Sequence, residues 1–239
     1  MNLNISKNIL LTLSGMFVFQ STSLLVAFFL SKIGKFDIFG QYQFFISSCS
    51  FFILIAKSGI DEKISYTLTE KQNWDIIDPK NNKIILNLNI AFFTSLLASL
   101  CTVIFYFGYS FISEIKIDFF TSLYAFLYIP PFILVIMISS FFRAQNDILN
   151  RTISIYYIPS LFFISFLCFF YLFFELNINM FLIARVSTYI LAAVFCFWII
   201  YKKFKFSNHI QIFNYKNFNI SHLKKELSNW FIFPLICFL

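Results

Sequence analysis

The sequence predicts an all-α protein, a polytopic bundle of membrane-spanning helices. Six apolar stretches fill most of the 239 residues, and each is near or above the roughly 20 residues that a helix needs to cross a bilayer. Mean hydropathy is +0.79, and charged residues make up only 12% of the chain, about half the share of a soluble domain. Continuous apolar runs such as 162–170 exclude the alternating pattern of an outer-membrane barrel. Only helices then satisfy the backbone hydrogen bonds in lipid.

The first three spans are expected at Ile9–Leu30, Gln41–Ile60 and Ile84–Ile112. The first follows Lys7 and is too long for the apolar core of a signal peptide, and no small-x-small cleavage site follows it. It is therefore interpreted as a span that stays in the protein. The short turn 31–40 joins the first two spans on one side of the membrane, and the mixed-charge loop 61–83 joins the second and third on the other.

The next three spans are expected at Phe119–Phe142, Thr152–Phe174 and Met180–Tyr201. The fourth contains Pro130 and Pro131 and the fifth contains Pro159, so these two helices are predicted to kink. Together, residues 1–201 form the predicted six-helix lobe.

The rest of the chain is divided into a loop and the start of a further span. Residues 202–229 form a basic loop, in which apolar residues recur at helical spacing from Ile220 to Trp230, typical of an amphipathic helix on the membrane surface. Residues 230–239 begin a seventh span that is too short to cross the bilayer. The sequence thus suggests a truncated reading frame or a fragment of a longer transporter.

The distribution of charge predicts the orientation. Short loops that face the cytosol are enriched in Lys and Arg. The N-terminus and every second loop carry most of these residues, whereas the other loops carry only Lys32, Lys35 and Lys116. We therefore expect a cytosolic N-terminus. The basic residues on that side are Lys7, Lys63, Lys71, Lys80, Lys83, Arg143, Arg151, Lys202, Lys203, Lys205, Lys216, Lys224 and Lys225.

Several classes of function are disfavoured by what the sequence contains. The basic residues are explained by orientation and by contact with lipid headgroups, so nucleic acid is not an expected partner. The five cysteines stand singly within apolar runs, and both histidines, His209 and His222, lie in one polar loop. No metal-binding spacing, nucleotide-binding loop or nucleophile arrangement is found. We predict no enzyme activity, no metal and no cofactor.

One segment, SKIGKFDIFGQY at 31–42, is the most specific in the chain. It resembles the turn after the first helix in the O-antigen flippases, a group of polysaccharide exporters within the multidrug/oligosaccharidyl-lipid/polysaccharide superfamily. Chemistry favours the same pattern, since one glycine can end a helix and another permits a close turn into the next. The residues that match are Lys32, in place of the usual arginine, and Gly34, Phe39, Gly40 and Tyr42.

The resemblance extends to 55–60, 142–146 and 218–234 and so covers nearly the whole chain. It implies the N-terminal lobe of a two-lobe transporter in the bacterial inner membrane. The implied function is the flipping of lipid-linked oligosaccharide, carried on polyprenyl pyrophosphate, by alternating access. The implied partners are membrane lipids and that substrate, and other membrane proteins of polysaccharide assembly are further candidates.

Cationic residues within the spans are the first candidates for a cavity that accepts an anionic substrate. For Lys57, a phosphate contact competes with an ion pair to Asp61 and with extension to the membrane surface. For Arg185, the alternative is an ion pair with Glu175. Arg143 stands at a span end, where extension to the surface competes.

Polar residues of the first span are a second group of candidates. Ser14 and Ser21 are seven residues apart, hence on one helix face, and Gln20 lies beside them. They either line the cavity or hold helices together. Asp61 and Glu175, together with Asp147, are candidates for coupling transport to a proton or sodium ion.

Three alternatives to a flippase stay open. A multidrug antiporter of the same fold has the same pattern of spans. A membrane polysaccharide polymerase or glycosyltransferase would need a large outward loop, and the outward turns here are short. A truncated product without activity is the third.

Overall fold

The computed structural model describes residues 2–32, 36–57, 59–69, 82–112, 118–174 and 177–204, and every element in these ranges is a helix. Six helical segments there are long and apolar enough to cross a membrane. The predicted fold class, an all-α bundle of membrane-spanning helices, is therefore confirmed, and the chain is a multi-pass membrane protein.

The six spans match the expected stretches to within a few residues. Helices α1, α2, α4, α5 and α8 each form one span, and the fifth span consists of α6, a five-residue π-helix η1 and α7. A further helix, α3, follows α2. The bounds are α1 Asn2–Lys32, α2 Phe36–Lys57, α3 Ile60–Thr69, α4 Asn82–Ile112, α5 Phe119–Ala144, α6 Ile148–Thr152, η1 Ile153–Tyr157, α7 Ile158–Phe173 and α8 Ile178–Phe204.

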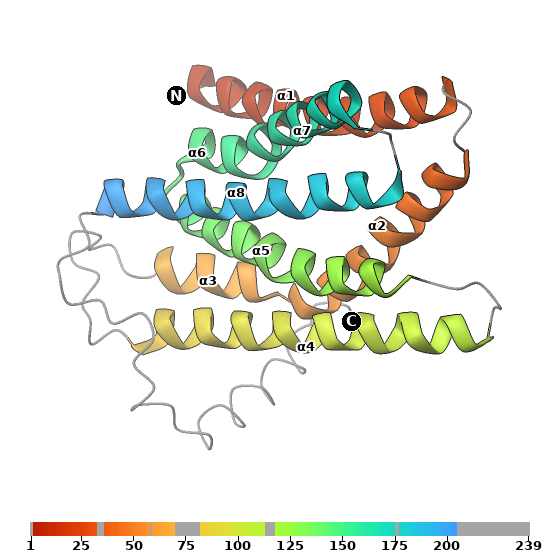
Figure 1. Cartoon of the computed structure of the whole chain (residues 1–239). Coiled ribbons are helices and arrows are strands. Elements are labelled where there is room, and N and C mark those ends of the chain that lie inside the picture. Colours follow the sequence, from red (N-terminus) through yellow and green to blue (C-terminus); the bar gives the residue numbers. More distant parts are fainter. Residues whose placement is uncertain are drawn as a thin grey trace.

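Helices α5 and α8 pack against each other at the centre of the bundle and are its most buried spans. Helix α4 covers one side of α5, while α1 and α7 lie on the opposite side of α8, and α2 crosses obliquely between the two sides (Figure 1). The start of α1, the end of α3, the start of α4, the α5–α6 turn and the end of α8 all lie at one end of the bundle (Figure 1). These segments are the ones that the charge pattern assigned to one side.

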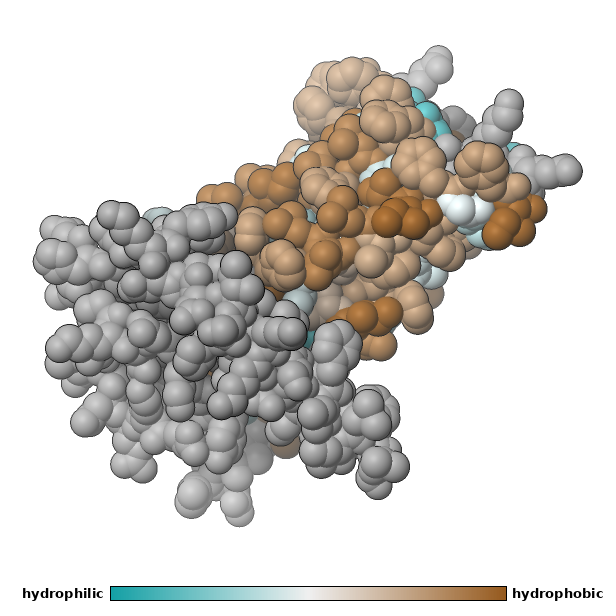
Figure 2. Space-filling model, turned by 90° about the horizontal axis from the view of Figure 1, so that it is seen from below, coloured by the Kyte–Doolittle hydropathy of each residue, from teal (hydrophilic) through white to brown (hydrophobic). Residues whose placement is uncertain are grey.

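The outer surface of the described helices is strongly apolar (Figure 2). Phe17, Leu54, Phe111 and Leu172 are each at least 70% exposed. A water-soluble protein rarely exposes so large an apolar area, but hydrocarbon is a good solvent for it. The surface is therefore the one that lipid covers.

Small hydroxyl side chains lie inside, where neighbouring helices approach closely. In α4, Ser95, Ser99 and Thr102 are buried and donate hydrogen bonds to carbonyls three or four residues back. A hydroxyl that donates to its own helix needs no partner on the next one, so α4 and α5 can pack tightly. Tyr106 extends this face, and its hydroxyl lies 2.6 Å from the Ser48 hydroxyl of α2.

The second predicted span ends differently from the expectation. Residues 61–83 were expected to form a loop, but α3 continues the helical path to Thr69 after a break at Gly59, where φ is +79°. This left-handed conformation suits glycine because it has no Cβ. The backbone N–H of Lys63 donates to the Gly59 carbonyl at 2.9 Å, which starts the new helix. Helix α3 packs against α5, and Ile64 is fully buried there.

The prolines occupy two different settings. Pro130 and Pro131 lie inside α5, and the helix continues through both. Pro159 stands in the first turn of α7, directly after η1. Proline lacks an N–H and crowds the carbonyl four residues back, and the wider π-helical turn before it accommodates that loss. The predicted kinks stay predictions, while the irregularity at Pro159 is a change of helix type.

Helix α1 approaches the fifth span closely at Gly15. A Cβ atom at this position would lie 2.5 Å from Cγ2 of Thr152 and 3.0 Å from Cδ2 of Tyr156. We expect Gly15→Ala to push α1 away and to lower the unfolding temperature, at a cost of about 1–3 kcal/mol. Thermal unfolding in detergent measures this effect.

Gly108 supplies the matched control, since nothing lies within 4 Å of a Cβ there. Gly108→Ala should leave the unfolding temperature unchanged or raise it, because alanine favours helix. Equal unfolding temperatures for the two alanine variants would contradict the close approach at Gly15.

Candidate functional site

Two places in the described helices carry cationic side chains that are candidates for a site. The first, which we name the basic end cluster, consists of Lys57, Asp61, Arg143 and Arg151 and lies where α2, α3, α5 and α6 meet. The second is the single side chain of Arg185, buried inside the bundle.

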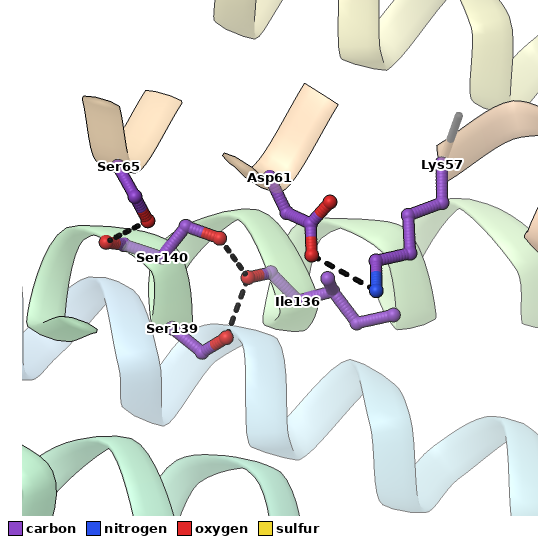
Figure 3. Close-up of polar contacts among 6 residues, drawn as sticks. All are labelled: Lys57, Asp61, Ser65, Ile136, Ser139 and Ser140. Atoms are coloured by element: carbon purple, nitrogen blue, oxygen red, sulfur yellow. Dashed lines mark hydrogen bonds and ion pairs between the residues drawn. The ribbon is translucent and has the colours of Figure 1, made fainter. Parts of the chain in front are cut away.

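The Lys57–Asp61 ion pair spans the break between α2 and α3. Lys57 Nζ lies 2.9 Å from Asp61 Oδ2, and the two side chains are 38% and 12% exposed (Figure 3). The break at Gly59 separates the helices, yet the four-residue spacing still brings the side chains together. Of the three interpretations of Lys57, the ion pair with Asp61 is observed, and the phosphate contact stays a prediction.

A hydrogen bond from Ser65 joins α3 to α5 beside this pair. Ser65 Oγ donates to the Ser140 carbonyl at 3.2 Å. Ser139 and Ser140 both donate to the Ile136 carbonyl, at 2.6 and 3.1 Å (Figure 3). Because the α5 serines are small and satisfied within α5, α3 can approach closely. Asp61 is thus held in a buried position rather than in a loop.

The two arginines enter the cluster from the α5–α6 turn. Asp147 caps α6, where its Oδ1 accepts from the Asn150 N–H at 3.2 Å and its Oδ2 accepts from the Asn150 side chain at 2.7 Å. This cap sets the direction of α6. It brings Arg151 close enough to Arg143 and Asp61 for their charges to interact. Two nearby arginines repel each other, so an anion between them would be favourable.

Arg185 is 6% exposed and is surrounded by aromatic side chains. Its guanidinium carbon lies 4.8 Å from the ring centroid of Phe163, 5.4 Å from that of Tyr189 and 5.9 Å from that of Phe19. The tyrosines of two further helices, Tyr42 and Tyr128, interact with its charge, and Tyr128 is in hydrogen-bonding position. Side chains from α1, α2, α5, α7 and α8 thus meet at one guanidinium.

The counter-charge expected for Arg185 was Glu175, which lies outside the described residues. Within the described ranges, the groups that interact with this guanidinium are aromatic rings and phenol hydroxyls, with no carboxylate among them. Its Nε has no hydrogen-bond partner there either.

The polar candidate residues of α1 differ from one another in their surroundings. Ser14 accepts a hydrogen bond from the Tyr157 hydroxyl at 2.9 Å and donates to the Leu11 carbonyl at 2.8 Å. Of its two interpretations, the one as a contact between helices is therefore observed. Gln20 is exposed on the surface of the bundle, and Ser21 is half-buried.

The residues of the 31–42 motif lie in different environments in the structure. Lys32 ends α1 and Gly34 lies outside the described residues. Gly40 was expected to make a close turn, but it lies inside α2 with open space around it, because the helix already begins at Phe36. Phe39 is half-buried against the core.

Tyr42 stands near the start of the second predicted span, a place typical of tyrosines at the membrane–water interface, but the structure contradicts that expectation. Its side chain is buried, and its ring is stacked on that of Phe163 at 6.2 Å between centroids. In this position it also faces Arg185. The buried cation draws this amphipathic ring inward.

Several residues of these two sites were missed in the sequence. Arg151 was counted only as an orientation charge, and Tyr128, Phe163 and Tyr189 were not singled out at all. A signal existed for Tyr189, which stands four residues after Arg185 and so on the same helix face. No signal linked Arg185 to Tyr128 or Phe163, because helix periodicity does not say which neighbour a face meets.

Replacing each partner of the Lys57–Asp61 pair should have unequal effects. We expect Lys57→Met to lower the unfolding temperature more than Asp61→Asn, because it leaves a largely buried carboxylate without its nearest cation. Lys57 alone can extend to the surface. The double variant should show a coupling of about 0.5–1 kcal/mol, measured by thermal unfolding in detergent.

Lys202, an exposed lysine over the Trp198 ring at the same end of the bundle, supplies the control. Lys202→Met should change the unfolding temperature little. Strict additivity of the two substitutions in the Lys57–Asp61 pair would show that the pair does not couple α2 to α3.

Comparisons with protein-family models, with curated proteins and with solved structures found no match to this chain.

Proposed function

We propose that this chain is a six-helix lobe of a transporter that moves lipid-linked oligosaccharides across the bacterial inner membrane, with its N-terminus in the cytosol. The single structural observation that carries the proposal is the basic end cluster within a six-span bundle. The resemblance of residues 31–42 to polysaccharide exporters points in the same direction.

The chemistry of the substrate explains why cations are needed. A polyprenyl-pyrophosphate oligosaccharide carries negative charge and a polar glycan, and both are costly to move through hydrocarbon. Lysine and arginine at the membrane boundary can bind the phosphates by charge-assisted hydrogen bonds. Arg143 is exposed and Arg151 is half-buried, so both can contact a ligand from the end of the bundle.

Lys57 would act as an exchangeable partner in this cluster. In the absence of substrate it is neutralised by Asp61, at 2.9 Å. An arriving phosphate competes with the carboxylate, and Arg151 remains near to balance Asp61. Because the pair spans the break at Gly59, exchange of partners would alter how α2 is held to α3. That coupling between binding and helix position is what alternating access requires.

The proposed orientation places the basic end cluster at the cytosolic face. The segments at that end of the bundle are those with most of the Lys and Arg residues. Substrate would then enter from the cytosolic leaflet, where the cluster can meet its headgroup.

The test is complementation of a strain in which the gene that encodes this chain has been deleted. We expect deletion to reduce surface polysaccharide and to cause lipid-linked repeat units to accumulate. The wild-type gene should restore display, and the double variant Arg143→Gln/Arg151→Gln should restore less than about a tenth of it, since two charge-assisted contacts are lost. Surface glycan staining and extraction of lipid-linked intermediates measure both effects.

A matched control separates transport from folding and orientation. Lys202→Gln removes an exposed positive charge at the same end and should restore full display. Protein abundance in the membrane should be equal for all variants. Normal glycan display after deletion, or drug sensitivity as the sole change, would contradict the proposal and favour an antiporter of small molecules.

A further inference from the structure

Arg185 poses an electrostatic problem that the described residues do not solve. The guanidinium is always charged, is 6% exposed and lies seven residues after Ile178, the first residue of α8, so about 10 Å along the helix. Each surrounding ring stabilises the buried cation by about 2 kcal/mol and carries no negative charge. A cation buried in a membrane bundle normally has an anionic partner.

Two buried hydroxyls on α8 and α7, the helices that carry Arg185 and Phe163, also lack partners. Thr188 Oγ1 and Ser160 Oγ are buried and have no hydrogen-bond partner among the described residues. Other buried hydroxyls, such as those of Ser99 and Thr102, donate to a carbonyl of their own helix at 2.8 Å, while Ser154 in η1 is a third buried hydroxyl without a partner among the described residues. Thr188 on α8 and Ser160 on α7 therefore each keep a hydrogen-bond donor that no described residue uses.

The spacing of these residues puts the free donors in one region of the interior. Thr188 is three residues after Arg185 on α8, and residues three apart are neighbours on a helix surface. Ser160 is three residues before Phe163 on α7, and the Phe163 ring lies 4.8 Å from the guanidinium. The Nε of Arg185 and the two hydroxyls can all donate, and none of them is occupied within the described ranges.

We propose that this region, between α7 and α8, holds a compact monovalent anion of the halide class, bound by Arg185, Thr188 and Ser160. Such an ion neutralises the guanidinium and accepts hydrogen bonds from both hydroxyls. A water molecule would satisfy the hydroxyls but would leave the charge uncompensated. A lipid phosphate carries more charge and a tail, and the five helices around Arg185 leave its side chain almost unexposed.

The experiment is thermal unfolding of the purified full chain in detergent. Sodium chloride or bromide is titrated against sodium gluconate at constant ionic strength, with a sodium phosphate series in parallel. We expect the halides to raise the unfolding temperature in a saturable way, and gluconate and phosphate to have no saturable effect. Arg185→Met should abolish the halide effect.

Thr188→Val is the second variant, for the case that Arg185→Met does not fold. It keeps the shape of the side chain, so the bundle should stay folded. It removes one hydrogen bond to the ion and should raise the half-saturating halide concentration about tenfold. Thr102→Val, at a buried hydroxyl that donates to its own helix, should leave that concentration unchanged.

Three outcomes would overturn the proposal. The first is an absence of any saturable halide effect on the wild-type chain. The second is a saturable effect of phosphate alone, which would assign the site to a phosphate group. The third is a wild-type chain that is insensitive to halide, together with a Glu175→Gln variant that lowers the unfolding temperature as much as Arg185→Met does, which would make Glu175 the counter-charge.

Discussion

The need to satisfy every polar group away from water governs this bundle. Hydrocarbon cannot form hydrogen bonds with a charged group or a hydroxyl, so such a group needs a partner inside the protein. Arg185 shows the constraint most clearly, since rings and phenols from α1, α2, α5, α7 and α8 converge on it. One side chain on the central helix α8 thereby sets where four other helices must place aromatic residues.

The same constraint explains how the remaining helices pack. Apolar side chains gain little from leaving lipid for a protein interior, so close approach and internal hydrogen bonds decide which helices associate. Helix α4 presents Ser95, Ser99 and Thr102 to its neighbours, each satisfied by its own backbone. Helix α1 uses Gly15 against Thr152 and Ser14 against Tyr157. Many of the large phenylalanines, such as Phe17 and Phe111, lie on the lipid-facing surface, whereas Phe45 and Phe142 are buried in the core.

The spans could be predicted from the sequence because the thickness of the hydrocarbon fixes their length. The two sides of the bundle could be grouped because charge is tied to the membrane surfaces. The break at Gly59 could not, since a glycine near the end of an apolar run is equally consistent with a helix that simply stops. Its positive φ, and the continuation as α3, depend on packing of Ile64 and Ser65 against α5.

The candidate site was only partly accessible to sequence reasoning for a related reason. The Lys57–Asp61 pair follows from a four-residue spacing and was among the interpretations considered. The aromatic surroundings of Arg185 come from positions between 19 and 189, far apart along the chain, and only the tertiary fold brings them together. Tyr42 illustrates the difference, since its place near a span end suggested the membrane interface, whereas the buried guanidinium determines its actual environment.

The two cationic places differ in how easily their partners can be exchanged. Lys57 is 38% exposed, sits at a helix end and is held by one carboxylate, so a competing anion can displace that carboxylate at modest cost. Arg185 is enclosed by five helices, and releasing it would expose several aromatic rings at once. Exchange during a transport cycle therefore falls to the basic end cluster. The interior arginine instead keeps the helices together while the break between α2 and α3 adjusts.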